Sequence, residues 1–227
     1  MAMSKSSSSL PADAAGVRLV PFGIPELPPP HASPAVLAEL HAELLPASPV
    51  VSMGPHFLRH FYYGVLPEEE LVLGYLAYVD EAPVGFQATT RDANGFLSAG
   101  VRRRWRSLVP LLVRHPPSLQ AVRRALEVGG DRHRRRHEQA SELLSMGVRP
   151  TRRPGATTGA STRQVAVMLI EAASQHLPRP LITLVDETNI PSRRLFEDLG
   201  WTASDRHTAG WLVPQVVYRW DREGISV

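Results

Sequence analysis

The feature that most restricts the fold of this chain lies between residues 142 and 185, where an apolar segment, a loop, a helical segment and a second apolar segment follow one another. Residues 142–148 and 181–185 have the length and composition of buried strands, and residues 161–175 place their apolar residues on one helical face. Strands that are joined through a helix run parallel in one sheet. The pattern therefore predicts a βαβ unit within an α/β fold.

The loop of this unit, residues 149–159, consists mainly of Arg, Pro, Thr and Gly. It leads into the N-terminus of the helix, where free N–H groups and the helix dipole attract phosphate, and the arginines add positive charge. An ordinary crossover loop with solvated arginines would have the same composition, and neither the Walker nor the Rossmann glycine spacing is present. The residues of the loop alone leave both interpretations open.

The rest of the chain adds strands and helices in a mixed order. Apolar spacing predicts a strand at 17–20, helices at 34–45 and 57–66, a hairpin of strands at 71–79 and 84–90, a helix at 191–199, and strands at 201–206 and 215–220. Helical spacing also extends from Val101 to Leu112, where Pro110 is expected to kink or end the helix, and a short helix is expected at 118–128. We therefore expect one α/β domain over residues 17–227, after a disordered tail at residues 1–16.

Composition excludes several classes of protein. The chain has no cysteine, which removes disulfide scaffolds, cysteine-ligated zinc and thiol nucleophiles. Its apolar runs are far shorter than the roughly 18 residues of a membrane-spanning helix, and no apolar stretch of a signal peptide is visible. His133 and His137 have the spacing of two helical metal ligands, but the arginines around them would repel a cation. We expect a cytoplasmic protein that holds no metal.

Positive charge is concentrated in residues 100–137, which carry 11 arginines against two acidic residues and thus a local net charge of +9, whereas the whole chain carries only +3. Residues 94–137 are expected to form a basic helical insertion. It could contact nucleic acid, with Trp105 as a stacking ring, or lie on an anionic membrane with Trp105, Leu108, Leu111 and Leu112 inserted. A helical lid over a substrate cleft is the interpretation that we favour, because the segment lies between the hairpin and the central strand. A packed insertion with a solvated basic face also accounts for the sequence.

Two segments resemble a known family. Residues 183–201 read Thr-Leu-Val-Asp-Glu-Thr-Asn-Ile-Pro-Ser-Arg-Arg-Leu-Phe-Glu-Asp-Leu-Gly-Trp. In this segment a strand ends near an asparagine, and a short helix follows that closes on an aromatic residue, two variable residues and Leu-Gly-aromatic. This arrangement resembles the signature of the GNAT superfamily of acyl-CoA-dependent N-acetyltransferases. Residues 143–150, Leu-Leu-Ser-Met-Gly-Val-Arg-Pro, look like the central strand of that family, which ends in Val-x-Pro. The resemblance covers residues 17–220 apart from the insertion, and it implies a mixed, centrally splayed β-sheet flanked by helices.

The resemblance implies acetyl-CoA as a co-substrate. In the family, backbone groups of the central strand bind the pantetheine arm and the following loop holds the pyrophosphate. The residues carried over are Met146 and Val148 for the arm, Arg152, Arg153, Gly155, Thr158, Gly159, Ala160 and Ser161 for the pyrophosphate, and Asn189 and Phe196 beside the arm. The loop departs from the family pattern of Arg or Gln, two residues, Gly, one residue, and Gly or Ala. Residues 152–157 match its start but end on Thr157, whereas residues 156–161, which the distance to Asn189 favours, have Ala156 where Arg or Gln is expected. Asn189 also suits a second role, as the cap of the following helix.

The resemblance further implies direct attack of an acceptor amine on the thioester. Glu142, at the start of the central strand, is the expected general base. Tyr62 and Tyr63 are expected to form a wall of the acceptor cleft. Many relatives have tyrosine where this chain has Phe196, which cannot donate a proton.

Two other functions stay open at this stage. The irregular loop and Phe196 favour a catalytically silent binding or regulatory module with the same fold, and the basic insertion allows a nucleic-acid or membrane-surface binder. We expect the acceptor to be a small-molecule amine and an anionic partner to be possible for residues 100–137. The sequence specifies neither the amine nor the oligomeric state.

Overall fold

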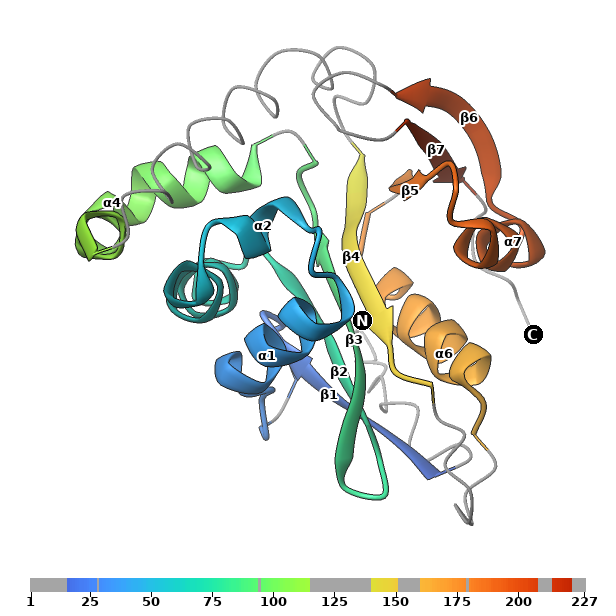
Figure 1. The fold of residues 1–227 in the computed structure, drawn as a ribbon, viewed down its shortest axis with the longest axis horizontal. Helices are drawn as coiled ribbons and strands as arrows, with labels where there is room; N and C mark the ends of the chain where they lie inside the picture. Colours follow the sequence, from blue (N-terminus) through green and yellow to red (C-terminus); the bar gives the residue numbers. More distant parts are fainter. Residues whose placement is uncertain are drawn as a thin grey trace, which may run out of the picture.

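The computed structural model describes residues 16–27, 29–93, 95–114, 140–150, 160–178, 180–207 and 214–221. These residues form a seven-stranded sheet in the order β1-β2-β3-β4-β5-β7-β6 (Figure 1). The strands are β1 (Val17–Phe22), β2 (Leu73–Val79), β3 (Ala82–Thr90), β4 (Ser141–Val148), β5 (Leu181–Asp186), β6 (Thr202–His207) and β7 (Gln215–Trp220). Neighbouring strands are antiparallel except β4 and β5, which are parallel. The predicted mixed α/β sheet and its βαβ unit are confirmed.

Helices cover both faces of the sheet (Figure 1). They are α1 (Pro34–Leu44), α2 (Pro49–Ser52), the π-helix η2 (Phe57–Val65), α3 (Leu66–Glu68), α4 (Phe96–Arg114), α6 (Thr162–Ser174) and α7 (Ile190–Asp198). Helices α1, η2 and α4 pack on one face, where Leu37, Phe61 and Leu108 share a core with Phe86 of β3. Helix α6 packs on the other face, and α7 lies beside β5–β7.

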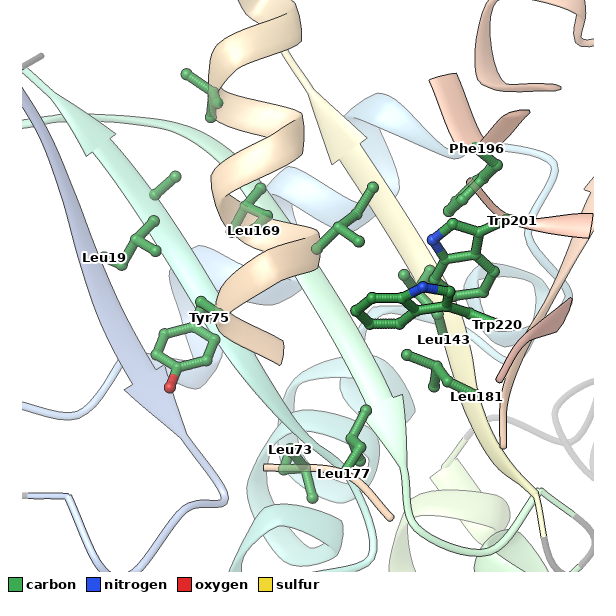
Figure 2. Packing of buried hydrophobic residues seen from close by; sticks show 14 of the residues in the cluster. Leu19, Leu73, Tyr75, Leu143, Leu169, Leu177, Leu181, Phe196, Trp201 and Trp220 are labelled. Atoms are coloured by element: carbon green, nitrogen blue, oxygen red, sulfur yellow. The ribbon is translucent and has the colours of Figure 1, made fainter. Parts of the chain in front are cut away.

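The core on the α6 face extends from β1 to β7 (Figure 2). Leu169 of α6 lies in it together with Tyr75 of β2 and Leu143 of β4. At its far end the rings of Trp201 and Trp220 stack with centroids 5.8 Å apart. This core joins strands β1–β4 to strands β5–β7, which follow the parallel crossover.

Close backbone packing fixes α1 against β4. A Cβ atom built on Gly147 would lie 2.9 Å from the Cβ of Leu44, closer than ordinary contacts allow. Glycine at this position therefore lets the end of α1 rest directly on the central strand. The β2–β3 hairpin turns through Asp80 and Glu81, which both have positive φ, as a two-residue hairpin turn requires.

The structure corrects one prediction about α4. The helix does not end at Pro110 but continues to Arg114, and the residue with non-helical backbone angles is Arg104, with φ −127° and ψ 31°. Arg103 and Arg104 both reach Glu69, at 3.6 and 2.5 Å. In an unbroken helix the side chains of Arg103 and Arg104 would point in different directions. The break at Arg104 lets both of them contact the Glu69 carboxylate. Helix α2 was not predicted, and the helix expected at 118–128 and the tail at residues 1–15 lie outside the described residues.

Candidate functional site

The gap between β4 and β5, called here the β4–β5 opening, is the distinctive feature of the sheet. The two strands pair over only three positions, from Ser141–Leu181 to Leu143–Thr183. At the last position the Thr183 hydroxyl donates to the Leu143 carbonyl at 3.1 Å. Beyond it β4 continues to Val148 and pairs with β3 alone, while β5 diverges (Figure 1). The expected central splay is therefore present.

The backbone of Met146 and Val148 faces this opening. The Arg149 N–H donates to the Val84 carbonyl at 2.7 Å, and Gly85 is aligned with Val148 in the antiparallel register. Because hydrogen-bonded and non-hydrogen-bonded pairs alternate along an antiparallel ladder, Met146 and Val148 direct their N–H and C=O groups away from β3. No strand pairs with that edge in the part of the chain that the structure describes.

The N-terminus of α6 is fixed by a capping box at Ser161. The Ser161 hydroxyl accepts from the Gln164 N–H at 3.2 Å, and the Gln164 side chain accepts from the Ser161 N–H at 2.7 Å. These two bonds hold the first turn of a helix whose positive dipole end suits an anion. Ala160 beside it is buried. Contact of Ala160 or Ser161 with a pyrophosphate stays a prediction.

Five of the residues expected to hold the pyrophosphate lie outside the described residues: Arg152, Arg153, Gly155, Thr158 and Gly159. Their assignment to a phosphate site stays a prediction.

Arg149, directly after β4, has a structural role. Its Nε donates to Glu43 of α1 at 2.8 Å, a second guanidinium nitrogen contacts the same carboxylate, and Nη1 donates to the Pro83 carbonyl at 2.9 Å. The hydrogen bond from Arg149 holds the pKa of the Glu43 carboxyl below its usual value. This arginine therefore fastens the end of β4 to α1 and β3.

Glu142 lies at the other end of β4, between Thr90 of β3 and Ile182 of β5. The residue keeps part of its surface in contact with solvent, although protein surrounds its carboxyl group, and this burial raises the pKa of Glu142 to about 8. A carboxyl group whose pKa lies near neutral pH can act as a general base.

Tyr62 and Tyr63 lie in the core on the α1 face, and each is only 2% exposed. Burial raises the pKa of both hydroxyls, and the nearby Glu142 carboxylate raises that of Tyr62 further. Tyr62 therefore lies close to the candidate base. The structure places both tyrosines inside the protein rather than on an open wall, so their contact with an acceptor stays a prediction.

A hydrogen-bonded chain leads from Tyr63 toward the surface. The Tyr63 hydroxyl lies 2.7 Å from Nδ1 of His41, and Nε2 of His41 lies 3.0 Å from the Ser48 hydroxyl. Burial lowers the pKa of His41 to about 4, so the imidazole is neutral at pH 7. Its ring also stacks on Phe86, with centroids 5.0 Å apart.

Asn189 and Phe196 belong to the α7 segment. The Asn189 side chain accepts from the Ser192 N–H at 3.2 Å, which gives it the helix-capping role. Phe196 is 3% exposed and packs against Trp201 and Tyr218, with ring centroids 5.0 and 5.9 Å away (Figure 2 shows its contact with Trp201). Contact of either residue with a cofactor arm stays a prediction.

Sequence reasoning missed His41 and Ser145, which join the tyrosines in the polar part of this core. His41 carried a usable signal, since it interrupts the apolar face of a predicted helix. Ser145 carried none. The β3–β4 register shifts between the pairs of Leu143 and Ser145, and this irregularity brings Ser145 near the two tyrosines, where it lowers the pKa of both hydroxyls against the larger effect of burial.

Within the described residues, no group of three or more His, Asp or Glu side chains could hold a metal ion. No helix in the same part of the chain is long and apolar enough to cross a membrane.

The sequence matches no protein-family model and no curated protein. Several solved structures are similar to it. A GNAT-family acetyltransferase from Bacillus cereus is 11% identical, with a TM-score of 0.48 over 92% of this chain and 99% of that one. The acetyltransferase yncA from Salmonella typhimurium, solved with acetyl-CoA, is 12% identical, with a TM-score of 0.49 over 93% and 97%. NAA60 from Arabidopsis thaliana, solved with a bisubstrate analogue, is 13% identical, with a TM-score of 0.49 over 90% and 97%. The chain is thus similar in structure to GNAT-family acetyltransferases over most of its length, at low sequence identity.

Proposed function

We propose that the protein is an acetyl-CoA-dependent N-acetyltransferase that acts on a small-molecule amine. The β4–β5 opening carries the proposal, because Met146 and Val148 direct backbone groups without a strand partner into it. The pantetheine arm of CoA contains amide groups, which can pair with such a strand edge. The capped N-terminus of α6 suits the pyrophosphate, and the resemblance of residues 143–150 and 183–201 to the GNAT family supports the same substrate.

Glu142 is the proposed general base. It accepts a proton from the acceptor amine as the amine nitrogen attacks the acetyl carbonyl carbon, and the carbon–sulfur bond then breaks to release CoA as a thiolate. Because the pKa of Glu142 is about 8, the basic form increases as the pH rises through that value. Phe196 has no proton to give, so the thiolate leaves without help from that position.

Binding and turnover test the proposal separately. Acetyl-CoA at about 100 times its dissociation constant should raise the free energy of unfolding by about 2.7 kcal/mol. Glu142→Gln should keep this stabilisation and slow turnover roughly 10²–10⁴-fold, whereas Glu171→Gln, an exposed change on α6, should alter neither. Released CoA can be followed with a thiol reagent, since the chain has no cysteine. Absence of any stabilisation by acetyl-CoA would contradict the function itself.

A catalytically silent module is the second candidate, favoured by Phe196 and its fully packed surroundings. It binds acetyl-CoA but transfers nothing. Stabilisation by acetyl-CoA without CoA release across a panel of amines would support this module over the enzyme.

A further inference from the structure

Helix α4 displays an apolar pair of side chains to solvent. Three large hydrophobic residues are strongly exposed in the described part of the chain: Trp105 at 54%, Val109 at 43% and Ile190 at 44%. Trp105 and Val109 lie one turn apart on α4. The side of the helix that carries Leu108 is already packed, since Leu108 is 3% exposed in the core shared with η2. Trp105 and Val109 therefore lie outside the contact that holds α4 on the protein.

The same helix is strongly basic, with five arginines and no acidic residue. Arg103 and Arg104 are paired with Glu69. Arg102 and Arg106 are exposed, and neither has an ion pair among the described residues. At 3.6 residues per turn, Trp105, Arg106 and Val109 fall within an arc of about 100°. Unpaired positive charge thus lies beside the exposed apolar pair.

We propose that α4 docks on an anionic lipid surface. Trp105 and Val109 enter the boundary between headgroups and acyl chains, where tryptophan is favoured. Arg102 and Arg106 stay at the level of the lipid phosphates, with their stems along the apolar boundary. Figure 1 shows α4 at the margin of the molecule, apart from the β4–β5 opening, so lipid contact leaves that opening accessible.

The contacts of Trp105 favour lipid over nucleic acid. The guanidinium carbon of Arg106 lies 5.6 Å from the centroid of the Trp105 ring, over the ring itself. Base stacking needs an open ring face, and Arg106 lies over one of the two faces of this ring. Val109 gives no advantage in binding phosphates but gains from insertion among acyl chains. A second copy of the chain would bring like charges together, which opposes self-association through this surface.

Sedimentation of the full chain with vesicles tests the proposal. We expect binding to mixed phosphatidylcholine–phosphatidylserine vesicles, weakened by salt, and little binding to phosphatidylcholine alone. Arg102→Glu with Arg106→Glu should weaken binding by at least about 30-fold, because each arginine near an anionic surface contributes about a factor of five. Trp105→Ser should also weaken it and remove the blue shift in fluorescence that insertion produces.

Ile190→Ser and Arg194→Glu are the matched controls, as residues of the same types on α7. They should bind vesicles like the unchanged protein. Circular dichroism and urea unfolding check that every variant is folded. Failure to bind anionic vesicles, or equal binding by Trp105→Ser, would overturn the proposal. Binding of oligonucleotides that depends on the two arginines but not on Trp105, without vesicle binding, would assign the surface to nucleic acid instead.

Discussion

Glu142→Gln should stabilise the protein at alkaline pH and leave its stability at acidic pH unchanged. Burial raises the pKa of Glu142 in the folded protein to about 8, from the ordinary value of 4.5 that applies to the unfolded chain. Below pH 4.5 the carboxyl is protonated in both states. As the pH rises from 4.5 to 8, the unfolded state loses the proton and the folded state keeps it, so the unfolded state is increasingly favoured. Glutamine has no proton to lose.

The size of this effect follows from the shift. At about 1.36 kcal/mol per pKa unit, the change from 4.5 to about 8 corresponds to at most about 5 kcal/mol. Solvent contact at the side chain lowers this limit, and we expect a gain of about 2–5 kcal/mol above pH 8. Urea unfolding at a series of pH values measures it, with Glu171→Gln as the exposed control. Parallel stability curves for Glu142→Gln and the unchanged protein would refute the reasoning.

Three further changes test the packing and capping. Phe196→Ala should lower the free energy of unfolding by about 3–5 kcal/mol, because it leaves a cavity beside Trp201, and urea unfolding would show it. Ser161→Ala should cost about 1 kcal/mol through loss of the helix cap, whereas an unchanged midpoint would deny that role. The unchanged protein should lose stability as the pH falls from 6.5 to about 4, because the unfolded state protonates His41 while the folded state keeps it neutral. His41→Phe should reduce this slope, and an unaltered slope would assign it to other groups.

Local signals explain why much of the fold was predictable. The α6 prediction, residues 161–175, differs from the observed helix Thr162–Ser174 only at its ends, because the cap at Ser161 and the apolar spacing both lie within the segment. The β7 prediction, residues 215–220, agrees with the observed strand at both ends. The break at Arg104 accompanies instead the contacts of Arg103 and Arg104 with Glu69, which is distant in sequence, and no local pattern indicates it.

The candidate site was less predictable, because it depends on register between strands. The orientation of the Met146 and Val148 backbone follows from which residues of β4 exchange hydrogen bonds with β3. The position of Ser145 follows from a register shift in the same pair of strands. Neither can be read from one strand alone, although the family resemblance pointed to the strand that borders the opening.

The short pairing between β4 and β5 has a mechanical consequence. The sheet consists of two smaller sheets, β1–β4 and β5–β7, which share three residue pairs and the Thr183–Leu143 hydrogen bond. This seam is the shortest ladder in the sheet, since the other neighbouring strands pair over more positions, so the backbone resists bending least along it. A molecule lying along β4 would occupy the place of the missing strand pairs and brace the two halves against each other. The stiffness of the protein would then be set by its ligand as well as by its own chain.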